Sequence, residues 1–146
     1  MRTVPKSEIV AVREAIGLEN LFDREGYVTS KEYSRLMRTL YTASYLSREG
    51  SQYILDLLNK AEFKDFLRKP ISENIPFPHK FGMGPSNNTY NDSGIVYLEN
   101  RPYLITVMIE ILGEESDMVG RERAAQIMRA ISNMSYQFFS TANESG

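Results

Sequence analysis

Cysteine is absent from the 146 residues of this chain, and that absence removes whole classes of chemistry. Without a thiol, the chain can hold no disulfide framework, no cysteine-ligated zinc or iron–sulfur cluster and no cysteine nucleophile. Histidine is scarce as well, because His79 is the only one. A histidine-rich zinc site is therefore impossible, and a Ser-His-Asp triad would have to include His79. We expect no metal and no other cofactor.

The chain also lacks long apolar runs and a strong net charge. Residues 1–8 contain no apolar stretch of the signal-peptide kind, so we expect no signal peptide. The most apolar run, 103–112, is interrupted by Glu110 and has about half the length that spans a bilayer, so we expect no membrane partner. The 17 basic and 19 acidic side chains give a net charge of −2. This balance argues against nucleic acid as a partner, because phosphate binding needs a basic surface.

Size and composition are those of one globular domain. At 146 residues the chain has room for a single domain, which we assign to residues 1–146. Hydrophobic residues make up 42% and charged residues 25%, which is typical of a folded domain with its own core.

Helical patterns dominate the first half. Thr29 and Glu32 have the spacing of a capping box, which predicts a helix start. The apolar residues that follow fall on one helical face: Tyr33, Leu36, Met37, Leu40 and Tyr41. A shorter helix is expected over 5–16. A further helix is expected after Ser47, and its predicted buried stripe is Ile54, Leu57, Leu58 and Ala61.

After Pro70 the pattern changes to prolines, glycines and short apolar runs. Residues 94–98 are apolar on both faces, as in a central strand. Residues 103–112 alternate, and the short link between the two runs predicts a hairpin. A last helix is expected over 117–139 with this apolar stripe: Ala124, Ile127, Met128, Ile131, Met134 and Phe138. The predicted fold is α+β: helices, then a short antiparallel sheet of about three strands, then a C-terminal helix.

The candidate site is the run His79-Lys80-Phe81-Gly82-Met83. A proline-rich approach and a glycine-rich exit enclose it, and Gly82 would let a ligand or another backbone come close. The same residues also fit a plain strand end with one lysine whose stem lies along apolar surface. Spacing alone leaves both interpretations open.

Several segments in order resemble the C-terminal half of the class A β-lactamase-like serine hydrolases. The resemblance covers residues 27–136, about three quarters of the chain. His79-Lys80-Phe81-Gly82 is similar to the family's H-K-T-G, whose K-T-G lies on the active-site edge of the sheet. The segments around it also match: 28–33 with Leu40-Tyr41, 45–47 with 54–58, 91–97 and 101–108. The implied fold is the C-terminal half of the β-lactamase/transpeptidase fold.

The resemblance implies a substrate-binding role for four residues. Lys80 would supply positive charge near the substrate carboxylate, and the N–H of Met83 would be one donor of an oxyanion hole. Gly82 would keep that edge open to the substrate. Phe81 stands where the family has a hydroxyl residue, so one hydrogen bond to a β-lactam carboxylate is lost.

No S-x-x-K and no S-D-N occurs in the chain, so we assign no catalytic residue. The resemblance places the nucleophile and its base in the half that precedes these residues. We therefore expect the chain to be part of a bacterial β-lactamase-like hydrolase of the antibiotic-resistance kind, inactive alone. Its substrate would be a β-lactam or a peptidoglycan peptide. The alternatives are a non-catalytic binding module on the same scaffold, or an accidental likeness. Family members are usually exported, but the chain leaves its compartment open.

The missing half also implies an exposed sheet edge. In the family, the strand equivalent to 103–112, from Tyr103 to Leu112, pairs with a strand that this chain does not contain. An unpaired apolar edge is a template for another chain, so self-association there is expected. For the same reason we expect parts of Ile127, Ile131 and Phe138 to be exposed.

Overall fold

The structure is a computed structural model that describes residues 4–18, 28–84, 88–113 and 116–141. Its helices and strands are α1 (Lys6–Ala15), α2 (Ser30–Thr42), α3 (Arg48–Asn59), β1 (His79–Gly84), β2 (Thr89–Val96), β3 (Tyr103–Glu110) and α4 (Asp117–Thr141). This order confirms the predicted α+β fold. Tyr27, where the resemblance begins, lies outside the described residues.

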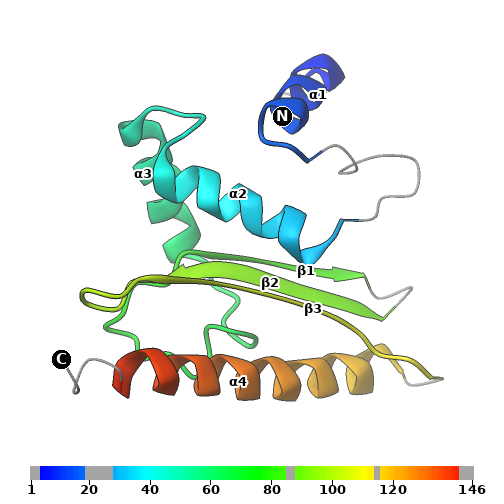
Figure 1. Ribbon diagram of the computed structural model, residues 1–146. Coiled ribbons are helices and arrows are strands. Elements are labelled where there is room, and N and C mark those ends of the chain that lie inside the picture. Colours follow the sequence, from blue (N-terminus) through cyan, green and yellow to red (C-terminus); the bar gives the residue numbers. More distant parts are fainter. Residues whose placement is uncertain (1–3, 19–27, 85–87, 114–115, 142–146) are drawn as a thin grey trace.

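The three strands form one antiparallel sheet in the order β1-β2-β3. Its register places Lys80 of β1 opposite Ser93 of β2, and Ser93 opposite Thr106 of β3. Figure 1 shows α2 and α3 on one side of the sheet and α4 on the other. Within the described residues, β1 and β3 are both edge strands, so the sheet is open on two sides.

Each face of the sheet has its own core. On the α2 and α3 side, Met37, Leu40 and Leu55 pack against Ile95 of β2. The larger core lies on the α4 side and contains these buried residues, among others: Phe66, Leu67, Phe77, Tyr90, Tyr103 and Met128. The segment between α3 and β1 therefore belongs to the α4 side, where its three phenylalanine rings help to fill the core.

Local sequence signals set the ends of two helices. The capping box is present: the N–H of Glu32 donates to Thr29 Oγ1 at 3.2 Å, and the N–H of Thr29 donates to Glu32 Oε2 at 2.8 Å. Ser47 caps α3, because its Oγ accepts from the N–H of Gly50 at 3.1 Å. These bonds satisfy amide groups that a helix start otherwise leaves without partners.

The predicted helical stripes are only partly confirmed. In α3 the fully buried residues are Ser51 and Leu55, while Ile54 and Leu58 of the expected stripe are partly buried against the same core. Leu57 is 51% exposed, so this member of the stripe was wrong. In α2 the stripe is buried at Met37 and Leu40, but Tyr41 at its end is exposed. The reason in both helices is the position of the sheet, which the sequence pattern does not contain.

Helix α4 buries one part of its predicted stripe and exposes the other. Ala124 and Met128 are fully buried against the sheet. Ile127 and Phe138 are exposed, as predicted, and Ile131 is only partly buried. None of the helices in the described ranges is both long enough and apolar enough to cross a membrane.

Candidate functional site

The backbone of β1 alternates between bonding to β2 and facing the open edge. Pro78 O accepts from the N–H of Ile95, and Pro76 O accepts from the N–H of Tyr97, each at 3.0 Å. Hydrogen-bonded pairs alternate along an antiparallel ladder. Continuing this alternation along the register, Lys80 and Gly82 bond to β2. The N–H and C=O groups of Phe81 and Met83 then point away from β2, to the edge of the sheet.

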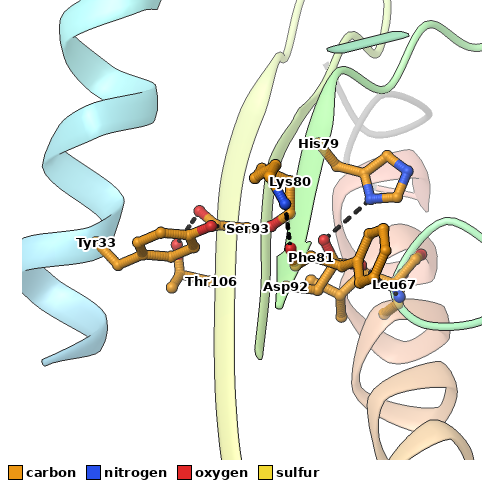
Figure 2. Close-up of polar contacts among 9 residues, drawn as sticks. Tyr33, Leu67, His79, Lys80, Phe81, Asp92, Ser93 and Thr106 are labelled. Carbon is orange, nitrogen blue, oxygen red and sulfur yellow. Dashed lines mark hydrogen bonds and ion pairs between the residues drawn. The ribbon is translucent and has the colours of Figure 1, made fainter. Parts of the chain in front are cut away.

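Lys80 is exposed at this edge, on the face of the sheet that α2 covers. Its Nζ donates to Phe81 O at 2.6 Å and lies 4.9 Å from the centre of the Phe81 ring. Tyr33 of α2 reaches the same place, because its Oη donates to Lys80 O at 3.2 Å (Figure 2). The lysine ammonium therefore lies beside an open strand edge, and the Tyr33 hydrogen bond connects α2 to that strand.

Next to Lys80, polar side chains of β2 and β3 line the same face. Ser93 Oγ lies 2.6 Å from Thr106 Oγ1, and Ser93 is fully buried. Across from Gly82, the side chain of Asn91 fills the space above the glycine: a Cβ there would lie 2.7 Å from Asn91 Oδ1. Gly82 thus makes room for a neighbouring amide of the protein itself.

Phe81 and Met83 differ in what they offer at the edge. The Phe81 ring stacks on Phe63 at 3.9 Å between ring centres and is packed against the α4-side core. The ring is only partly buried, and its other neighbour is the exposed Lys80 ammonium. Met83 is 39% exposed, and its N–H points outward by the alternation described above.

A buried pair of hydrogen-bonded side chains lies on the opposite face of the sheet. His79 Nδ1 is 2.9 Å from Asp92 Oδ1, and the two side chains are 2% and 0% exposed. Asp92 Oδ2 also accepts from the N–H of Leu67 at 3.2 Å (Figure 2). The His79 ring stacks on Phe77 with 5.2 Å between ring centres. These contacts tie β1 and β2 to the turn that contains Leu67, directly under the strand that carries Lys80.

Two of the three members of a hydrolytic triad are thus paired, but within the described ranges no serine is hydrogen-bonded to either of them. Ser93 follows Asp92 in the strand, so its side chain points to the other face. There its Oγ bonds to Thr106, a hydroxyl that cannot act as its general base. Among the residues that the structure describes, His79 and Asp92 therefore form a structural pair and not part of a triad.

Electrostatics keep the Tyr33 phenol protonated. Burial, followed by the negative charge of Asp92, raises the pKa of Tyr33 to about 12. At neutral pH the hydroxyl is therefore a hydrogen-bond donor, which is the role it has toward Lys80 O. The described residues contain no group of three or more acidic or histidine side chains that could hold a metal ion.

Sequence reasoning placed Lys80, Gly82 and Met83 on a strand but missed three neighbours. Tyr33 was assigned to a helix core, and Asn91 and Thr106 carried no signal of their own. Their proximity to Lys80 results from the β1-β2-β3 register and from the position of α2. No local pattern could have revealed it.

Comparison with known proteins gives a consistent result. The family model described as the beta-lactamase enzyme family matches residues 3–139. Among solved structures, PBP-A has a TM-score of 0.73 at 21% identity, with 92% of this chain and 51% of PBP-A covered. A PBP-A variant solved as an acyl-enzyme complex with penicillin G has a TM-score of 0.71 at 20% identity, with 92% of this chain and 52% of the variant covered.

A third structure is a beta-lactamase from Sphaerobacter thermophilus DSM 20745. Its TM-score is 0.75 at 16% identity, with 94% of this chain and 54% of that enzyme covered. The chain therefore spans about half the length of these structural neighbours. No curated protein sequence matches it.

Proposed function

Because the chain belongs to the beta-lactamase enzyme family, we propose that it supplies the lysine-bearing strand and oxyanion edge of a β-lactamase-like serine hydrolase site. The observation that carries the proposal is the geometry of β1. Lys80 is exposed at an open strand edge, and the N–H of Met83 on the same strand points outward. Carbonyl-directed chemistry needs a positive charge and an outward backbone donor together.

The substrate class follows from these two groups. The Lys80 ammonium can bind a carboxylate, such as that of a β-lactam or of a peptidoglycan peptide. The Met83 N–H can donate to a carbonyl oxygen as negative charge develops on it. Tyr33 and the Ser93–Thr106 pair hold the backbone and the neighbouring strands in place, since their hydroxyls are already engaged with protein atoms.

The nucleophile has to come from residues outside this chain. No S-x-x-K is present, and Ser93 is buried and bonded to a second hydroxyl. The structural neighbours are about twice as long, which leaves room for a further segment that carries a serine and its base. We therefore expect the chain by itself to bind but not to acylate.

A second candidate is a non-catalytic binding module built on the same scaffold. Phe81 favours it, because this position carries a ring stacked on Phe63 where the family motif has a hydroxyl residue. The two candidates agree on the Lys80 edge as the binding site, and they differ in whether a nucleophile-bearing segment completes it.

Turnover and acylation test the proposal. The purified chain is incubated with a chromogenic cephalosporin and, separately, with penicillin G followed by intact-mass analysis. We expect hydrolysis at the background rate and an unchanged mass. Saturable turnover, or a covalent adduct on any serine, would show that the chain holds its own nucleophile and would overturn this division of roles.

A further inference from the structure

A groove follows one side of α3, next to the residue that succeeds β2. Two cavities of about 430 and 290 Å³ form it, and both are lined by Gln52, Leu55 and Tyr97. The α3 residues along it recur at intervals of three or four positions and therefore share one side of the helix: Arg48, Ser51, Gln52, Leu55, Asp56 and Asn59. The other walls are the end of α2 and the two prolines before β1. Among the described residues, none from β3 or α4 lines either cavity.

The larger cavity has an apolar floor with one hydroxyl in it. Leu40 of α2 and Leu55 of α3 line the cavity and are 8% and 4% exposed. Ser51 lies between them and is 2% exposed, and its Oγ has no hydrogen-bond partner among the described residues. A buried hydroxyl without a partner is destabilising, and rotation about the single χ1 bond redirects it. The floor therefore suits a ligand group that combines a hydrogen-bond acceptor with a methyl.

Tyr97 lies where the two cavities meet. Its ring centre is 6.1 Å from that of Tyr41, with the two planes tilted by 48°, and Tyr41 is 49% exposed. Burial raises the pKa of Tyr97, and the neighbouring Tyr41 and Asp56 raise it further, so its hydroxyl is a hydrogen-bond donor at neutral pH. The negative face of an aromatic ring attracts C–H groups that carry partial positive charge, such as those on one face of a sugar ring.

Planar polar side chains line both ends of the groove. Arg48 forms no ion pair with an acidic side chain of the described residues. At the other end, Gln52 Nε2 donates to Asp56 Oδ1 at 2.8 Å, which leaves one acceptor oxygen on each of these two side chains. Asn59 Oδ1 accepts from the N–H of Phe77 at 2.7 Å, which leaves the Asn59 Nδ2 donors for a ligand. Both donors and acceptors are therefore available, as a ligand with several hydroxyl groups requires.

We propose that this groove binds an N-acetylated amino sugar within an oligosaccharide. The acetamido methyl packs on the two buried leucines, and the acetamido carbonyl oxygen accepts from the Ser51 hydroxyl. The sugar ring stacks on Tyr97, and hydroxyls of the adjoining sugar bond to the planar side chains around Asp56. The inference goes beyond the function proposed above, since none of the groove residues belongs to the Lys80 edge.

Other ligand classes leave part of the groove without partners. A plain hexose has no methyl for the apolar floor and no carbonyl for Ser51. An apolar ligand would bury the Ser51 hydroxyl and the Asp56 carboxylate without hydrogen bonds, which is unfavourable. Arg48 lines the same cavity as Ser51 and can bind a carboxylate through two parallel hydrogen bonds. The groove therefore favours an N-acetylated sugar that also carries a carboxylate.

Amide chemical-shift mapping of the isotope-labelled full chain with three sugars tests the proposal. The first is tri-N-acetylchitotriose, and the second is the disaccharide of N-acetylglucosamine and N-acetylmuramic acid, which adds a carboxylate. The third is cellotriose, the counterpart of the first without acetamido groups. We expect saturable shifts around Ser51 and Tyr97 with the first two sugars and none with cellotriose. At least threefold tighter binding of the muramic acid disaccharide would indicate a peptidoglycan source, and the reverse order a chitin-like source.

Two variants and their matched controls locate the site. Ser51→Ala should weaken binding of both N-acetylated sugars at least fivefold without loss of thermal stability, because the hydroxyl has no protein partner and alanine favours helix. Tyr97→Leu should weaken it at least tenfold. The controls are Ser34→Ala in α2 and Tyr53→Leu, which removes a ring of α3 that is 65% exposed and does not line the groove. Both controls should stay within twofold of the parent.

Circular dichroism establishes that each variant is folded, and Ser51→Ala decides alone if Tyr97→Leu does not fold. The proposal is overturned if neither N-acetylated sugar gives saturable shifts up to about 10 mM, where a site with a dissociation constant of about 1 mM is mostly filled. Equal binding of cellotriose, or binding that Ser51→Ala leaves unchanged, would also overturn it. These results leave the proposed function untouched, because its test is turnover and acylation.

Discussion

Replacing Asp92 by alanine should be among the most damaging single changes in this chain. The carboxylate is fully buried and has two partners, His79 Nδ1 at 2.9 Å and the N–H of Leu67 at 3.2 Å. Removal of the side chain leaves both of these groups without an acceptor in the interior. The variant therefore tests the contacts that connect β1 and β2 to the turn beneath the candidate site.

The magnitude follows from the two groups left without partners. Each buried donor that loses its acceptor costs about 1–3 kcal/mol, and a bond to a charged acceptor lies toward the upper end of that range. We expect Asp92→Ala to lower the free energy of unfolding by about 3–5 kcal/mol. Typical domains have about 5–15 kcal/mol in total, so this is a large share.

Urea unfolding measured by circular dichroism checks this expectation. The matched control is Asp65→Ala, which removes an acidic side chain that is 46% exposed and paired with Arg121 at 2.9 Å. An exposed pair contributes about 0–1 kcal/mol. A double-mutant cycle with His79→Ala should give a coupling energy of about 1–3 kcal/mol. A loss below about 1 kcal/mol for Asp92→Ala, or a coupling energy near zero, would refute the role assigned to the pair.

Three further predictions concern the same sheet. Lys80→Ala should change the free energy of unfolding by no more than about 0.5–1 kcal/mol in urea titration, because the side chain is exposed; a loss above about 3 kcal/mol would mark it as a buried structural partner. Gly94→Ala should lower the free energy of unfolding by about 1–3 kcal/mol, since the new Cβ would lie 2.6 Å from Pro78 O. Gly82→Ala should lower it less, because the Asn91 side chain beside that position can move. Equal losses for the two variants would contradict this. The pKa of Tyr33 is raised from 10.0 to about 12, so the stability that its protonated form contributes is complete below pH 10 and is lost as pH rises through 12. In thermal unfolding, the melting temperature of Tyr33→Phe should therefore fall less at alkaline pH than that of the parent. An identical fall would be contrary evidence.

The fold was predictable where local chemistry decides it. The Thr29 and Glu32 spacing gave the start of α2, and the apolar alternation after Pro102 gave β3, because capping and strand periodicity act within a few residues. The start of β2 was not predicted. Asn91, Asp92 and Ser93 are poor strand formers, and they are accommodated through the His79 pair, the space above Gly82 and the Thr106 hydroxyl.

The candidate site was predictable only along β1. The motif around Lys80 identified the strand, and the alternation of backbone bonds then placed the Met83 N–H at the open edge. Tyr33 stands 47 residues from Lys80 in sequence, and its contact depends on how α2 lies across the sheet. The sequence likewise did not separate the exposed from the buried apolar residues of α4, because the same periodic pattern includes both.

Amide chemical-shift mapping with penicillin G tests the central claim most directly. On the isotope-labelled chain, we expect saturable shifts concentrated at Lys80, Gly82 and Met83, with an intact mass that does not change. Lys80→Ala should weaken this binding at least threefold, while Lys69→Ala, which removes a lysine from the segment before β1, should not. Shifts that gather elsewhere, or binding that Lys80→Ala leaves unchanged, would contradict the assignment of the β1 edge as the substrate-binding part of this chain.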